Sequence, residues 1–141
     1  MKISTRGRYA LRVLADMAER DIGEYVPLKD IAKRQEISLK YLEGIMILLS
    51  KSNIVEGVHG KGGGYKLKKP PEDITLGDVL RITEGSLAPV ACLDSGAAAC
   101  DRAENCKTLS VWREFNELIN GFFDGKTLKD LVSSGGGEYV I

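Results

Sequence analysis

Three cysteines lie close together in a stretch of the chain that shows little helical or strand periodicity. Cys92, Cys100 and Cys106 are separated by seven and then five residues, in a segment (86–107) rich in alanine and glycine. Thiolates are soft ligands, so a flexible loop of this kind could wrap them around zinc or an iron–sulfur cluster. The spacing contains neither a C-x-x-C motif nor a fourth cysteine. Inert thiols or a redox pair therefore stay open as alternatives.

A second group of polar residues lies on two predicted short helices. Apolar residues at helical spacing predict one helix over 28–35 and another over about 39–50, with Ser38 as the N-cap of the second. Two helices joined by a three-residue turn form a helix-turn-helix, which places its second helix in the DNA major groove. Small helical domains often contain such a pair without binding DNA, so the pair alone does not decide the function.

The helix pair is followed by a predicted β-hairpin. Residues 53–58 are β-prone, residues 59–64 read HGKGGG, and a strand resumes over 65–67. Glycines at the tip allow positive φ and close approach of the backbone to a phosphate chain. The pattern predicts a winged helix-turn-helix, in a mainly α fold with a small β-hairpin wing.

The remaining helices are predicted from their caps and apolar spacing. Ser4 or Thr5 would cap a basic first helix, and Thr75 would cap a helix that ends near Gly85. A long helix ending near Gly125 has an apolar stripe too wide for one small core, which favours pairing with the same helix of a second subunit. Packing wholly within its own domain is the alternative. A last short turn comes after Thr127.

We expect residues 1–71 to form the DNA-binding domain, 72–132 to hold the effector loop and dimerisation helices, and 133–141 to be a flexible tail. Residues 1–70 contain 14 Lys and Arg against 8 Asp and Glu, a net charge of +6, whereas residues 71–141 contain 6 against 12, a net of −6. The cationic half would meet phosphates. The candidate DNA contacts are Lys2, Arg6, Arg8, Lys29, Ser38, Lys40, Tyr41, Glu43, His59, Lys61 and Tyr65.

No run approaches the roughly 18 apolar residues of a membrane helix, and the N-terminus does not read as a signal peptide. We therefore expect a cytoplasmic protein with no membrane partner. No base is adjacent to a cysteine in the sequence, so we expect no enzyme activity and no small-molecule substrate.

The motifs together resemble the Rrf-two family of bacterial winged-helix repressors, which has IscR-, NsrR- and CymR-like branches. The resemblance runs from MKISTRGRYALRVL through VPLKDIAKRQEISLKYLE and GVHGKGGGYKL to ITLGDVLRITEG, the three-cysteine loop, WREF and TLKDLV. It implies a homodimer with crossed C-terminal helices, a palindromic DNA operator, and Cys92, Cys100 and Cys106 as ligands of an iron–sulfur cluster, [2Fe–2S] rather than [4Fe–4S]. It also implies that Ser38, Lys40 and Glu43 face the groove.

The sequence departs from the family pattern at several positions. Leu109 stands where IscR-like members have a histidine ligand, and Arg8 stands where NsrR-like members have an aspartate ligand. The fourth ligand is therefore open, with Asp101, Glu104, a small thiol or water as candidates. Gly44 stands where a glutamine is frequent, so the operator sequence can differ.

We expect a sequence-specific transcription repressor that senses iron–sulfur status, redox state or nitric oxide through the cysteines. The alternative is a metal-free regulator of the same fold, controlled by thiol oxidation or by a partner protein.

Overall fold

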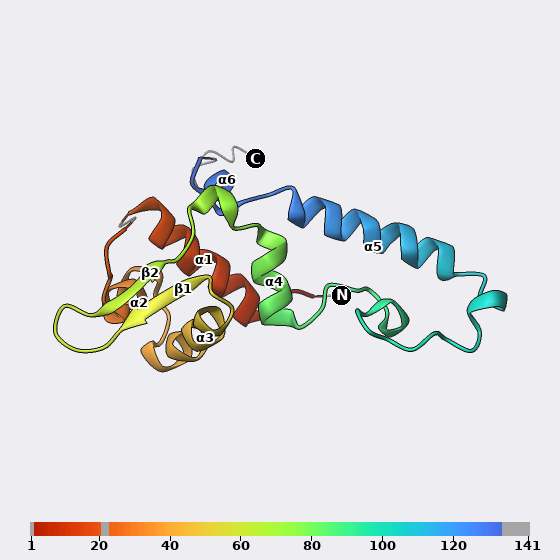
Figure 1. The fold of residues 1–141 in the computed structure, drawn as a ribbon, viewed down its shortest axis with the longest axis horizontal. Helices are drawn as coiled ribbons and strands as arrows, with labels where there is room; N and C mark the ends of the chain where they lie inside the picture. The colour runs from red at the N-terminus through yellow and green to blue at the C-terminus, as the bar shows by residue number, and fades with distance from the viewer. Residues whose placement is uncertain (1, 21–22, 134–141) are drawn as a thin grey trace.

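The computed structural model describes residues 2–20 and 23–133, which form a helical head with one long helix extending from it (Figure 1). It is mainly helical with a single two-stranded antiparallel hairpin among the described residues, which confirms the predicted fold class. None of the described helices is long and apolar enough to cross a membrane. The elements are α1 (Thr5–Glu19), α2 (Leu28–Gln35), α3 (Leu39–Lys51), β1 (Val55–Val58), β2 (Gly64–Leu67), η1 (Pro71–Asp73), α4 (Leu76–Glu84), η2 (Ala91–Leu93), η3 (Ala103–Asn105), α5 (Leu109–Asp124) and α6 (Leu128–Ser133).

The helices α1, α3 and α4 each begin with a capping side chain. Ser4 and Ser38 each accept the backbone N–H three residues further on, at 3.0 and 3.2 Å, and so satisfy one unpaired donor of α1 and of α3. Thr75 and Asp78 form a reciprocal capping box at the start of α4. These local bonds set the first turns of α1 and α3, which carry most of the candidate DNA contacts, and of α4.

Ile119 of α5 is buried in a small cluster with Leu80 and Leu87, whereas the main core of the head is built from α1, α2, α3, α4 and α6, together with β1. Its fully buried side chains include Leu14, Ile31, Leu42, Met46, Leu49, Val55, Val79 and Leu128. Leu128 belongs to α6, so the chain returns to the head after α5. The Leu128 N–H donates to the Ile74 carbonyl at 3.0 Å, which ties this return to the start of α4. Residues on the C-terminal side of position 71 thus contribute to the same core as the helix-turn-helix.

The wing is a hairpin fastened to the head by one extra residue. In the hairpin Val55 pairs with Leu67 and Val58 with Gly64. Val26 then pairs with Tyr65 through two backbone hydrogen bonds of 2.9 Å. A Cβ on Gly64, whose φ is 152°, would overlap the Val26 carbonyl, so this close approach requires glycine.

Several boundaries differ slightly from those expected, and the second strand begins at Gly64 rather than at Tyr65. The first strand begins at Val55 rather than at Asn53, because Asn53 takes a left-handed φ of 60° in the turn after α3. Ser133 is the last residue of α6, and residues 134–141 of the predicted flexible tail lie outside the described residues.

Candidate nucleic-acid interface and cysteine loop

The second helix of the helix-turn-helix presents a polar face to solvent. Its apolar side, which includes Leu42 and Ile45, is buried in the core. On the other side Lys40, Glu43 and Gly44 are exposed. The helix therefore has the buried back and accessible front that insertion into a major groove needs.

The first helix of the pair is fastened to α1 by a buried carboxylate. Asp16 is 4% exposed and accepts hydrogen bonds from Arg34 Nε at 3.1 Å and from Gln35 Nε2 at 2.7 Å. Arg20, the residue after the last residue of α1, forms a longer ion pair with the same carboxylate, with its Nε 3.8 Å from an oxygen of Asp16. Burial alone would raise the pKa of Asp16, but the bonds from Arg34 and Gln35 and the nearby positive charges lower it below its ordinary value. Asp16 thus stays ionised and sets where α2 lies against α1.

Aromatic packing fastens α3 to the same helix. The rings of Tyr9 and Tyr41 meet edge to face, with centroids 5.8 Å apart. The guanidinium of Arg12 lies over the Tyr9 ring, 5.0 Å from its centroid. Tyr41 remains 41% exposed, so part of this candidate DNA contact is accessible while the rest supports the position of α3.

The start of α1 lies beside α3 and carries three predicted cationic contacts. Lys2, Arg6 and Arg8 are all exposed. A surface hollow of about 640 Å³ brings Arg6 together with the predicted contacts on α3, and its lining is Arg6, Ser38, Lys40, Tyr41, Gly44, Ile45 and Leu48. Four of the predicted DNA-binding residues therefore share one surface feature.

The start of α1 is itself held by a residue 80 positions away. Glu84, the last residue of α4, accepts from the Ser4 backbone N–H at 3.1 Å and from Ser4 Oγ at 2.6 Å. This contact was not predicted, because nothing near Ser4 in the chain signals it. Asp16 was missed as well, although a carboxylate three residues after Val13 and one before Met17, inside an apolar stripe, was a readable signal.

The wing carries its candidate residues in two different settings. His59 and Lys61 are exposed at the tip, where Gly60 and Gly62 have φ of 95° and 80°. Tyr65 instead lies half-buried over Gly57, where a Cβ would approach its ring to 2.7 Å. Tyr65 thus stabilises the hairpin, whereas Lys61 at the tip is the exposed positive charge of the wing. Lys29, the remaining candidate, is exposed near the start of α2.

The three cysteines are accessible but apart. Cys92 and Cys100 are exposed, and Cys106 is half-buried with its Sγ 3.5 Å from the Thr108 hydroxyl. The hydrogen bond from Thr108 lowers the pKa of the Cys106 thiol. Across residues 2–20 and 23–133, no three His, Cys, Asp or Glu side chains converge in a way that could hold a metal ion. The structure therefore does not bring the predicted ligands into one site.

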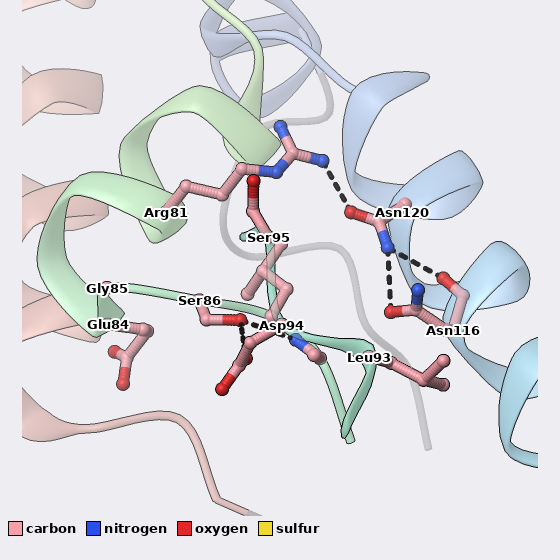
Figure 2. Close-up of a pocket in the computed structure, with 11 residues that line it drawn as sticks. Arg81, Glu84, Gly85, Ser86, Leu93, Asp94, Ser95, Asn116 and Asn120 are labelled. Atoms are coloured by element: carbon pink, nitrogen blue, oxygen red, sulfur yellow. Dashed lines mark hydrogen bonds between the residues drawn. The ribbon is translucent and has the colours of Figure 1, made fainter. Parts of the chain in front are cut away.

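A polar hollow of about 590 Å³ lies where the cysteine loop starts, between the end of α4 and the face of α5 (Figure 2). Ser86 and Asp94 are joined across the loop by a hydrogen bond of 2.5 Å. On the opposite side Asn120 accepts a hydrogen bond from Arg81 at 2.7 Å. The loop thus begins at a polar contact between two helices, next to Leu87, which is buried against Leu80 and Ile119.

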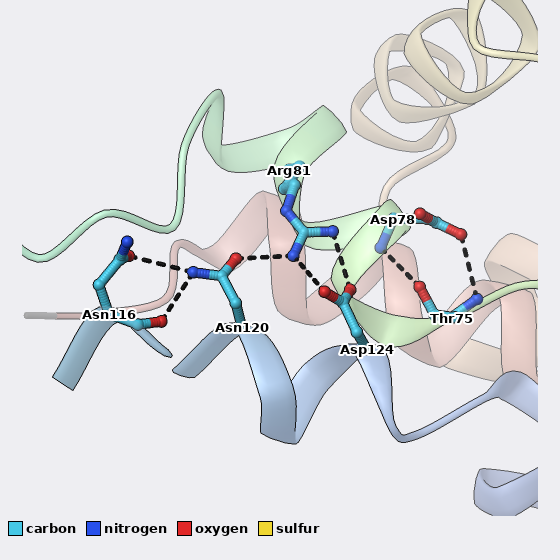
Figure 3. A network of polar contacts seen from close by, with 6 residues as sticks. All are labelled: Thr75, Asp78, Arg81, Asn116, Asn120 and Asp124. Atoms are coloured by element: carbon cyan, nitrogen blue, oxygen red, sulfur yellow. Dashed lines mark hydrogen bonds and ion pairs between the residues drawn. The ribbon is translucent and has the colours of Figure 1, made fainter. Parts of the chain in front are cut away.

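The long helix is held to α4 by a bidentate ion pair. Both terminal nitrogens of Arg81 donate to the carboxylate of Asp124 at 2.8 Å (Figure 3). This bond raises the pKa of Arg81 and lowers the pKa of Asp124. The outer side of α5 keeps large apolar side chains in solvent, namely Val111, Trp112, Phe115, Leu118 and Phe122. One side of α5 is therefore anchored and another has no cover within the described part of the chain.

Comparison with known proteins agrees with this architecture. The profile of the Rrf2 family, described as an iron-dependent transcriptional regulator, matches residues 3–134. The chain belongs to the Rrf2 family. It is 37% identical over 134 residues to the HTH-type transcriptional regulator IscR of Klebsiella pneumoniae, an alignment that covers 95% of this chain and 81% of that protein. The corresponding regulator of Escherichia coli K12 is 36% identical, with 95% and 82% covered.

Solved structures resemble the whole fold. CymR (YrzC), the global cysteine regulator of B. subtilis, superposes with a TM-score of 0.77 at 31% identity over 96% of this chain and 98% of that one. T. potens IscR superposes with a TM-score of 0.75 at 30% identity, covering 100% and 93%. The family resemblance and the winged-helix fold expected from the sequence are confirmed. The IscR relatives and the family itself are named as transcriptional regulators, which is not an enzymatic function.

Proposed function

We propose that this Rrf2-type regulator is a homodimeric repressor that binds a palindromic DNA operator in the cytoplasm. The observation that carries the proposal is the solvent-accessible face of α3 together with the hollow beside it. Arg6 and Lys40 line this hollow and add positive charge next to the exposed face. Cations at the rim would contact phosphates and set the position of the protein. Side chains on α3, above all Glu43, would contact base edges.

The wing supports the same interpretation. Its tip places Lys61 and His59 in solvent on a hairpin that is anchored through Val26 and Tyr65. A phosphate contact from such a tip would strengthen binding without reading sequence. The candidate cationic contacts therefore lie near the start of α1, on α2, on α3 and on the wing.

Dimerisation is proposed from the uncovered side of α5. Leu118 is 65% exposed and Phe122 is 59% exposed, on a helix that extends away from the head (Figure 1). An apolar stripe of this length in water favours a partner, and a second copy of α5 is the simplest one. Two heads related by a twofold axis would bind two half-sites, which explains the expected palindrome.

The cysteines are proposed as the sensing site. Three accessible thiols in one loop match the donor chemistry of an iron–sulfur cluster. The choice of [2Fe–2S] rather than [4Fe–4S] comes from the family resemblance alone. Cys92, Cys100 and Cys106 would hold the cluster, which supplies a redox-active centre when it is bound. Their separation means that the loop would have to change conformation to gather them. The loop connects α4 to α5. The last residue of α4, Glu84, accepts a hydrogen bond from Ser4 at the start of α1. A change in the loop could therefore affect both the proposed DNA-binding surface and the proposed dimerisation surface.

A metal-free regulator controlled by thiol oxidation or by a partner protein is the second candidate. The exposed, separate thiols favour it, as does the likeness to the CymR structures, one of which is an oxidized form. Anaerobic purification with iron and acid-labile sulfide assays, followed by operator binding with and without the cluster at one salt concentration, separates the two. Iron and sulfide in cluster ratio, lost in Cys100→Ala, would support the cluster. An iron-free protein after attempted reconstitution would favour the thiol switch.

A further inference from the structure

Gly44 lies inside α3, and no packing contact within the described chain requires a glycine at this position. At Gly7 and Gly77, in α1 and α4, a Cβ would overlap a carboxylate oxygen of Glu84 or of Asp124, so a larger residue would displace a carboxylate that makes hydrogen bonds. At Gly44 a Cβ would meet nothing within 4 Å, and the residue is exposed. Glycine destabilises the interior of a helix relative to alanine. No contact among the described residues compensates for that cost at Gly44.

The space that Gly44 leaves open joins the hollow between α3 and the start of α1. Tyr41, Ile45 and Leu48 give this hollow apolar walls, and Arg6 and Lys40 add positive charge. No acidic side chain contributes to its lining in the described chain. An occupant that fits this lining carries a small apolar group close to a negative charge.

Thymine in duplex DNA has that combination of groups. Its C5-methyl group projects into the major groove, beside the phosphate backbone of the same strand, and apolar side chains recognise it by contact. A helix with no side chain at one outward position also lets the base edge approach the backbone more closely than alanine would. The positively charged side chains of Arg6 and Lys40 would then lie near the phosphate of that thymine nucleotide.

We propose that Gly44 is a specificity-determining position, because its missing side chain admits the C5-methyl group of one thymine per half-site into the hollow walled by Tyr41 and Leu48. This inference rests on the proposed function, since it needs α3 to enter the major groove. It gives Gly44 a role in base selection that differs from the polar contact expected of Glu43.

The test measures DNA affinity after two changes: removal of a methyl group from the DNA by replacing thymine with uracil, and addition of a methyl group to the protein by Gly44→Ala. An operator is first selected from random duplexes with the wild-type protein. Each thymine is then replaced by uracil, which lacks only the C5-methyl group, and affinities are measured for wild type, Gly44→Ala and Gly121→Ala. For wild type, replacing this thymine in one half-site should weaken binding about fourfold, the value expected for one buried methyl-sized group, and replacing it in both half-sites about fifteenfold. Gly44→Ala should bind the thymine and uracil operators equally at that position.

Gly121→Ala is the matched control. Gly121 is also a helical glycine with nothing within 4 Å of a Cβ, but it lies in α5 and not in α3. Both alanine variants should unfold at higher urea concentration than wild type, which shows that neither is misfolded. Gly121→Ala should keep the wild-type ratio of thymine to uracil affinity.

Three results would overturn the inference or its basis. Equal thymine preference in wild type and Gly44→Ala would show that the methyl group does not enter this hollow. A wild-type protein indifferent to every uracil replacement would exclude methyl recognition altogether. A wild-type protein that selects no operator would refute the proposed function itself, and the inference with it.

Discussion

Replacing Asp16 by alanine should release the helix-turn-helix from α1. The carboxylate is 4% exposed and receives hydrogen bonds from Arg34 and Gln35, so the substitution removes the partner of a largely buried ion pair. Breaking such a pair costs about 3–5 kcal/mol when both partners are fully buried. The Arg34 side chain is 29% exposed and can regain water, so we expect the free energy of unfolding to fall by about 3 kcal/mol.

Urea unfolding followed by circular dichroism, at one protein concentration, measures this loss. With an m value of about 1.5 kcal/mol/M, the midpoint should fall by about 2 M urea. Arg20→Ala is the matched control, because Arg20 pairs with the same carboxylate at 3.8 Å but its side chain is 53% exposed. An exposed pair contributes about 0–1 kcal/mol. Equal midpoints for the Asp16 and Arg20 variants would refute the role assigned to the buried carboxylate.

The pH dependence gives an independent check on the same residue. The pKa of Asp16 is lower in the folded protein than its ordinary value, so its contribution is complete above the unfolded pKa of about 3.9 and is lost as the pH falls through the folded pKa. The difference in unfolding free energy between wild type and Asp16→Asn should therefore be constant near neutral pH and shrink below about pH 4. A difference that stayed constant down to about pH 2 would mean that ionisation of Asp16 does not stabilise the fold.

Three further substitutions test the proposed surfaces. Glu43→Ala should change the preferred base at one position of each half-site, because a carboxylate can accept from cytosine N4; an unchanged selected site would contradict this. Lys61→Ala should weaken binding to all sequences alike and reduce the slope of log affinity against log salt by about 1 per half-site, so an unaltered slope would remove the wing from the interface. Leu118→Asp should place a charge in the outer stripe of α5 and give monomers in sedimentation experiments, whereas a persistent dimer would locate the interface elsewhere.

The cap and the exposed side of α3, which form much of the candidate DNA-binding surface, could be predicted because their signals are local. Ser38 caps α3 as predicted, since a cap and the N–H that it accepts lie three residues apart. The spacing of Leu42, Ile45 and Met46 identified the buried side of α3. The opposite side, with Glu43, was then left to solvent. The assignment of these residues to DNA contacts stays a prediction.

The spatial arrangement of the three cysteines could not be predicted from their spacing in the sequence. The sequence places three thiols within fifteen residues, and that proximity predicts a shared ligand. In the structure the segment between Ser86 and Thr108 runs along the surface with two short 3₁₀ turns, and its thiols do not converge. Closeness along an irregular chain does not imply closeness in space, because each intervening residue has its own backbone freedom.

The sequence alone determined the main helices and the hairpin, the caps of α1, α3 and α4, the distribution of charge and the family, because these depend on residues only a few positions apart or on the pattern of the whole chain. Only the tertiary structure decided that Glu84 holds Ser4, that Arg81 holds Asp124, and that Leu128 returns α6 to the head. The partners in the first two contacts are 80 and 43 residues apart. Such pairs form because packing of the apolar core brings distant helices together, and only then do the polar side chains at their ends come within hydrogen-bond reach.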